Sequence, residues 1–314
     1  MAKGNLLQGY ARGSVGDVVF SRVKGQQIAK ARNRQPANPR TKVQMYQRSI
    51  FISAVKFFSR GNQNQFKFAY EDRKTTESDY NAFMRINAKN GTYLTKGMAD
   101  NPVWPSIGYF TMSKGSLSPV KMQLFKRDHL TALAVAGFGI QDGAAATVAQ
   151  LSDALKMFNP QLMNGQIVTF FTIRSTAQVD TTGEMSLDSD TALPQWSVYQ
   201  VKIDTTDNTE LPWTFVETKD GAQYITITGE GGNLYIDEPN VEQTDSQYVS
   251  GFGVIVSQNT PNGLKVSTCE LELNERAKKV YNYYTSTAWK ELCAADWGAS
   301  QTAVLQGGLL ENQD

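Results

Sequence analysis

The chain has 314 residues, of which 40% are hydrophobic and 19% are charged, and its formal net charge is +1. This length is sufficient for one large domain or two of ordinary size, each with a buried core. No segment approaches the ~18 apolar residues of a membrane span, the first residues lack the pattern of a signal peptide, and two cysteines are too few for a disulfide framework. We therefore expect synthesis in a reducing host cytoplasm and no membrane partner.

Charge is strongly segregated along the chain. Residues 1–60 contain twelve basic side chains and one acid, Asp17, which gives this segment a formal charge of +11. Residues 175–250 contain fourteen acids but only two basic residues, Lys202 and Lys219, for a formal charge of −12. This asymmetry predicts a basic N-terminal region that meets a polyanionic or acidic partner.

The N-terminal region is predicted to form a β-hairpin over residues 14–34. Its first strand contains Val15, Val18 and Phe20, Lys24-Gly25 supplies the turn, and the second strand alternates apolar with basic residues. Two prolines then favour an extended connector over residues 35–39.

A helix follows the connector. Asn38 is predicted to be its N-cap, Pro39 its first residue and Gly61 its left-handed C-terminal cap. The apolar stripe consists of Val43, Tyr46, Ile50, Ala54 and Phe57, and the basic residues off this stripe are Arg40, Arg48, Lys56 and Arg60. We expect this helix to have one apolar and one basic side.

The rest of the chain alternates mostly with period two. Strands are predicted at 107–112, 120–125, 130–135, 167–173, 196–203, 224–228, 233–236, 248–258 and 264–273. Helices are predicted near 78–89, 147–158 and 275–295. We therefore predict an α+β fold, mainly antiparallel β, with a sandwich or jelly-roll-like body and packed helices.

Three regions follow from this pattern. Residues 1–61 form a basic arm of hairpin, connector and helix, residues 62–305 form the β-rich body, and residues 306–314 form a polar C-terminal tail.

Few residues of the chain suit catalysis or metal binding. The single histidine, His129, would have to serve any histidine-based mechanism, and its place between Asp128 and a strand is more typical of a turn. Asp188 and Asp190, with Glu184 nearby, lack the spacing of a known cation loop and read as a solvated surface. We expect no enzyme activity, no catalytic or metal-ligating residues, no cofactor and no small-molecule substrate.

The basic arm is the candidate binding site, because lysine and arginine neutralise phosphates without sequence preference. The candidate residues are Arg12, Arg22, Lys24, Lys30, Arg32, Arg34, Arg40, Lys42 and Arg48. Two partners remain open for them, namely nucleic acid and the acidic 175–250 surface of a neighbouring subunit.

An ordered series of short motifs runs through residues 9–58. It comprises Gly13-Ser14-Val15-Gly16, then Asn38-Pro39-Arg40-Thr41, then Gln47-Arg48 within an apolar helix. The series resembles the N-terminal signature of an uncharacterised family associated with Bacteroidetes and their phages. That resemblance implies a viral or phage structural protein of capsid type, and it carries over no catalytic residues.

The leading hypothesis is a self-assembling coat protein of a virion. Its partners would be itself in many copies and packaged nucleic acid, and complementary patches on one chain suit such an assembly. The alternative is a non-virion nucleic-acid-binding protein of a mobile element, in which Tyr10, Phe20 or Tyr46 would stack on bases. A third hypothesis, a glycan hydrolase with a carboxylate pair, ranks lowest.

Overall fold

The computed structural model describes most of the chain. The described residues are 11–23, 26–33, 40–101, 106–127, 130–136, 147–176, 178–186, 195–210, 217–218, 221–222, 226–230, 233–237 and 248–298. They fall into two compact units. The smaller unit comprises Met1–Thr41 with Lys74–Thr76 and Ser300–Asp314, and the larger comprises Lys42–Arg73 and Glu77–Ala299.

The smaller unit contains a three-stranded antiparallel sheet. Its strands are β1 (Gly13–Val15), β2 (Val18–Val23) and β3 (Gln26–Ala31), in the order β1-β2-β3. The predicted hairpin corresponds to β2 and β3, and β1 is a strand that the prediction lacked. The extra reversal occurs at Gly16-Asp17, where Gly16 has a φ of +55°, a conformation that favours glycine in tight turns.

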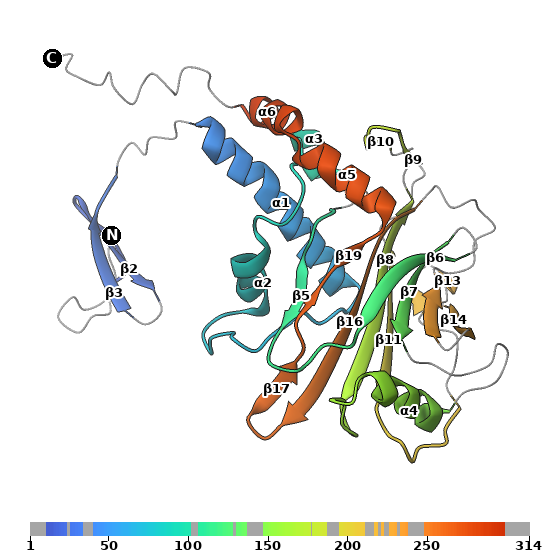
Figure 1. Cartoon of the computed structure of the whole chain (residues 1–314). Helices are drawn as coiled ribbons and strands as arrows, with labels where there is room; N and C mark the ends of the chain where they lie inside the picture. The colour runs from blue at the N-terminus through green and yellow to red at the C-terminus, as the bar shows by residue number, and fades with distance from the viewer. Residues whose placement is uncertain are drawn as a thin grey trace. The chain divides into compact units, whose positions relative to one another are not determined.

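The larger unit is built on antiparallel sheets (Figure 1). The principal sheet has the order β11-β8-β16-β17, with β19 also paired to β16. Its strands are β8 (Ile167–Thr176), β11 (Gln195–Lys202), β16 (Tyr248–Thr260), β17 (Gly263–Val266) and β19 (Glu272–Leu273). The register runs without a break along β8, from Ile167 opposite Ser257 to Thr176 opposite Tyr248. The pair of β8 and β16 is therefore the longest continuous pairing in the principal sheet.

The remaining strands form smaller sheets. The four-stranded one has the order β14-β15-β7-β6 and comprises β6 (Met122–Arg127), β7 (Leu130–Ala136), β14 (Thr226–Glu230) and β15 (Asn233–Asp237). A three-stranded sheet joins β18 (Cys269–Glu270), β5 (Thr111–Lys114) and β4 (Ala69–Tyr70), and β4 pairs with β5 in parallel. Two short ladders pair β9 (Gln178–Val179) with β10 (Met185–Ser186), and β12 (Glu217–Thr218) with β13 (Gly221–Ala222).

The fold class is α+β with mainly antiparallel sheets, as predicted. The sandwich or jelly-roll arrangement remains a prediction. The strand predicted at 264–273 is wrong as a single element, because it is divided into β17, β18 and β19, which pair with different neighbours.

Six helices complete the part of the chain that the structure describes. They are α1 (Lys42–Gln63), α2 (Asp79–Asn87), α3 (Lys96–Asp100), α4 (Val148–Phe158), α5 (Glu275–Thr285) and α6 (Thr287–Asp296). The predicted helix starts at Ser78 and Thr147 are confirmed, since each side chain accepts a hydrogen bond from a first-turn amide. The single helix predicted at 275–295 is wrong, because Ser286 leaves the helical conformation, with φ −61° and ψ 154°, and caps α6.

Helix α1 differs from its prediction in its start, its buried face and its end. It begins at Lys42 and not at Pro39, because Arg40 has a φ of +45°, outside the helical range. Its buried positions are Met45, Ser49, Ser53, Ala54, Phe57 and Gly61, whereas the predicted stripe residue Val43 is 62% exposed. Gly61 does not end the helix, which continues to Gln63, and Gln65 adopts the left-handed conformation with φ +59°. Moreover, α1 lies in the larger unit beside α6, whereas we had grouped it with the basic arm (Figure 1).

Aromatic side chains form the centre of the core. Phe57 from α1 stacks on Phe110, with ring centroids 4.1 Å apart, and lies 5.2 Å from Trp196 of β11. Phe66 lies 4.9 Å from Phe171 of β8, and Phe68 lies the same distance from the ring of Phe83 in α2. Burial of such large rings contributes strongly to stability, so this cluster fixes α1 and α2 against the principal sheet.

Within the described residues, no helix combines the length and apolar character that crossing a membrane requires.

Candidate nucleic-acid or subunit interface

The three-stranded sheet of the smaller unit has two chemically different faces. Residues that are directly opposite in the register share a face, and successive residues alternate between faces. Val15, Val18 and Ala31 are opposite one another, as are Gly13, Phe20 and Ala29. These two rows form an apolar face.

The other face carries Lys30 and Arg32. The row Ser14, Val19 and Lys30 lies on it, the row Ser21 and Ile28 adds one hydroxyl and one apolar side chain, and strand alternation adds Arg32. Arg12 directly precedes β1 and is separated from Ser14 by Gly13, which has a φ of +106°. Lys30, Arg12 and Arg32 are all exposed. Because a strand advances ~3.3 Å per residue, Lys30 and Arg32 lie about 7 Å apart along the direction of β3. We call Lys30 and Arg32, together with Arg12 at the start of β1, the basic face.

The acid Asp17 sits at one end of the basic face. It lies in the turn between β1 and β2, and its carbonyl accepts a hydrogen bond from the amide of Arg32. The basic residues on this face still outnumber this one acidic residue.

The other predicted cations lie elsewhere. Arg22 is exposed but lies on the apolar face, in line with Val18 and Phe20. Arg40 is exposed just before α1 and has a φ of +45°. Lys24 and Arg34 lie outside the described residues. The nine predicted residues therefore do not all share one surface.

The two predicted cations of α1 differ in their surroundings. Lys42 forms a 2.9 Å ion pair with Glu291 of α6, and Glu291 also accepts a hydrogen bond from the Tyr46 hydroxyl. Both hydrogen bonds hold the pKa of the Glu291 carboxyl below its ordinary value. Arg48 is exposed. Lys42 therefore already has an anionic partner within the chain.

Lys56 is not part of a basic surface, contrary to the prediction for α1. Its ammonium donates hydrogen bonds to the carbonyls of Met98 and Asn101, at 2.9 and 2.5 Å, where α3 ends. Cations at a helix C-terminus bind its unpaired carbonyls. Burial, together with nearby Arg60, lowers the pKa of Lys56 to about 8. The hydrogen bonds of this lysine join α1 to the end of α3, while burial disfavours its charged form.

The groups considered for catalysis or metal binding show no assembled site in the described residues. Cys269 and Cys293 are both buried, and burial raises their thiol pKa values to about 12 and about 11. No cluster of three histidine, cysteine or carboxylate side chains occurs there that could hold a metal ion. Of the other candidates, His129, Asp188 and Asp190 lie outside the part of the chain that the structure describes.

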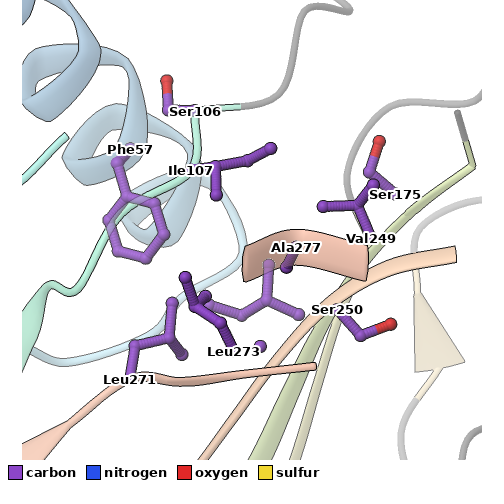
Figure 2. A pocket seen from close by; sticks show the side chains of 11 residues that line it. Phe57, Ser106, Ile107, Ser175, Val249, Ser250, Leu271, Leu273 and Ala277 are labelled. Carbon is purple, nitrogen blue, oxygen red and sulfur yellow. The ribbon is translucent and has the colours of Figure 1, made fainter. Parts of the chain in front are cut away.

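A small apolar cavity lies between α1, α5 and the principal sheet (Figure 2). Its volume is about 30 Å³, which is room for about two water molecules. The hydroxyls of Ser106, Ser175 and Ser250 at its edge find no hydrogen-bond partner among the described residues. Figure 2 shows that none of these hydroxyls points towards another, so they do not converge on one ligand.

Comparison with known proteins adds one finding. Residues 10–104 match a family described as a family of unknown function, DUF6266. The match covers less than a third of the chain and includes the three-stranded sheet and helices α1 to α3. Its description names no activity, partner or origin. No curated protein and no solved structure matches the chain.

Sequence reasoning identified the cations but not their arrangement. Charge counting selected Arg12, Arg22, Lys30 and Arg32 together, whereas strand register places Arg22 on the face opposite to Lys30 and Arg32. The register depends on the turn at Gly16-Asp17. The Gly-Asp pair is a typical hairpin turn signal and could have revealed it.

Proposed function

We propose that this protein is a self-assembling structural protein of a virion, a coat protein whose basic face contacts packaged nucleic acid. The observation that carries the proposal is the exposure of Lys30 and Arg32 on one face of a small sheet, with Arg12 exposed at the start of its first strand. Location in the virion follows from the same proposal.

The spacing of these cations suits a phosphate backbone. Phosphate contacts position a protein on nucleic acid without reading its sequence, and each neutralised phosphate releases counterions. Packaging of a whole genome requires contacts of this kind, because a coat protein meets every sequence in that genome. Ser14 and Ser21 lie on the same face and add hydroxyl groups between the cations.

The competing partner is the acidic segment of a second copy. Three carboxylates of this segment each accept hydrogen bonds from a threonine two residues later. They are the exposed Asp180 and the partly buried Asp204 and Asp207. These bonds lower the pKa of all three carboxyl groups. Each carboxylate is therefore charged but fixed by hydrogen bonds within its own turn. It is less free to reorient towards the cations on the sheet of a second copy.

The experiment compares two triple variants of equal net charge. The first replaces Arg12, Lys30 and Arg32 by glutamine. The control replaces three exposed lysines of the larger unit, Lys121, Lys202 and Lys265, by glutamine. Binding of a fluorescent single-stranded oligonucleotide is measured by anisotropy between 50 and 300 mM salt.

Loss of three phosphate contacts should reduce the slope of log K against log salt by about 2 for single strands, at ~0.7 per contact. The control variant should retain the wild-type slope. Equal slopes for the basic-face variant and the wild type would overturn the proposed contact with nucleic acid.

A further inference from the structure

The outer edge of β3 can be described in atomic detail from one hydrogen bond. The amide of Arg32 donates to the carbonyl of Asp17, and these residues continue the register of Ala31 with Val18. In an antiparallel ladder, hydrogen-bonded pairs alternate with pairs that are not bonded. The β3 residues bonded to β2 are therefore Lys30, Ile28 and Gln26, which continue the alternation from Arg32 just beyond the strand.

The intervening residues direct their backbone groups the other way. Gln27, Ala29 and Ala31 point their N–H and C=O groups towards the outer edge of β3, which is the end strand of its sheet among the residues that the structure describes. An edge of this kind is a template for another strand. Proteins usually protect such edges with proline, bulges or several charges, whereas β3 carries only Lys30 as a charged residue.

The side chains at this edge also leave room for another strand. Ala29 and Ala31 are small and exposed, and they lie on the apolar face beside Val15 and Val18, which are 60% and 39% exposed. A sheet of three short strands has little core of its own. Extension of the sheet at β3 would give hydrogen-bond partners to the outward-facing backbone groups and would enlarge the apolar face.

We propose that β3 pairs with β3 of a second copy of this chain, antiparallel and about a two-fold axis at Ala29. This register is the one that uses all three outward-facing residues. Ala29 pairs with Ala29 of the partner subunit, and Gln27 pairs with Ala31 of the partner subunit, in both directions. A two-fold interface is self-complementary, so a single strand supplies both sides.

Charge favours the same register. Lys30 is placed opposite Ile28 of the partner subunit, so no two lysines are directly opposed. The axis is perpendicular to the sheet, so both basic faces lie on one side of a six-stranded sheet. Pairing therefore doubles the phosphate-binding surface, although it goes beyond the proposed function because it requires no nucleic acid.

Disulfide trapping in the full chain tests the pairing directly. Ala29→Cys should give a covalent dimer, of about twice 34.8 kDa, under mild oxidation without nucleic acid. Opposite residues of a bonded antiparallel pair have Cα atoms ~5.5 Å apart, within disulfide range. The native cysteines are buried and should not compete.

The matched control is Ser21→Cys in the central strand β2. Ser21 cannot reach its counterpart across the axis, so this variant should stay monomeric on a non-reducing gel. Equal cross-linking of Ser21→Cys and Ala29→Cys, or no dimer from Ala29→Cys, would overturn the proposal.

A second pair of variants tests the backbone contact. Ala29→Pro removes an outward N–H and leaves the β2–β3 ladder intact, since proline is accepted on edge strands, whereas Ala29→Thr keeps the N–H. We expect Ala29→Pro to weaken self-association in sedimentation velocity by about tenfold or more and Ala29→Thr to preserve it. Wild-type association of Ala29→Pro would contradict the pairing.

The two proposals fail separately. If the basic-face glutamine variant still cross-links through Ala29→Cys but the wild type does not bind oligonucleotide, the strand pairing stands and the nucleic-acid function falls. Salt-dependent oligonucleotide binding without cross-linking gives the reverse conclusion.

Discussion

Gly61 offers a sharp test of the packing of α1. A Cβ at this position would lie 2.6 Å from Cζ and 2.7 Å from Cε2 of Phe68, and 3.1 Å from Cη2 of Trp196. The ring of Phe68 has little room to move, because it stacks on Phe58 at 5.1 Å and meets Phe66 edge-on at 5.1 Å. Gly61→Ala therefore sets helix propensity against packing.

The two effects can be compared. Alanine in place of glycine in a helix interior gains about 1 kcal/mol, whereas inserting a methyl into a filled core costs ~1–3 kcal/mol. We expect Gly61→Ala to lower the free energy of unfolding by about 1 kcal/mol, which corresponds to a fall in Tm of ~2–4 °C. Thermal and urea denaturation followed by circular dichroism measure the change.

Gly97→Ala in α3 is the matched control. A Cβ there meets nothing within 4 Å, so only helix propensity acts and the variant should be as stable as the wild type or slightly more stable. Stabilisation of Gly61→Ala to the same extent as Gly97→Ala would refute the packing explanation for this glycine.

Three further predictions concern the larger unit. Met45→Asp should lower stability more than Ile50→Asp in urea denaturation, because Met45 is 1% exposed whereas Ile50 is only partly buried; equal losses would contradict the observed helix face. The pKa of Lys56 is lowered to about 8, so the unfolded chain binds more protons above that pH and stability should rise from pH 8 towards 10; Lys56→Met should flatten this rise. The thiols of Cys269 and Cys293 should resist iodoacetamide at pH 8 until the protein is unfolded, since burial keeps them protonated, and rapid labelling of the native protein would refute this.

Local signals predicted the elements that depend on local chemistry. Ser78 and Thr147 cap helices because a hydroxyl beside a free amide is sufficient, whatever the rest of the fold does. The long strands β8, β11 and β16 were also found, because their β-branched and aromatic residues are typical of strands. Their pairing order required the structure.

Tertiary contacts decided what the sequence could not show. The buried face of α1 includes two serines, and Ser49 is accommodated by donating to the carbonyl of Leu94, 45 residues away. Gly61 resembles a helix cap in sequence, but its role is to admit the rings of Phe68 and Trp196. Leu94 and Trp196 are far from α1 in the sequence, so these contacts cannot be read from the helix itself.

The candidate site was predicted in part for a related reason. Counting charges is sufficient to find a basic region, because charge is a property of composition. Which cations share a surface depends on strand register, which separates Arg22 from Lys30 and Arg32. Charge counting also assigned Lys56 to a basic surface, whereas its ammonium binds backbone carbonyls at the end of α3.

The most direct test of the coat-protein proposal is the solution mass of the purified protein, measured by size-exclusion light scattering with the 260/280 nm absorbance ratio recorded across the peak. We predict a species far larger than 34.8 kDa whose absorbance ratio indicates bound nucleic acid. A small complex with nucleic acid would favour the alternative of a non-virion binding protein from a mobile element. A monomer of 34.8 kDa free of nucleic acid would contradict the proposal.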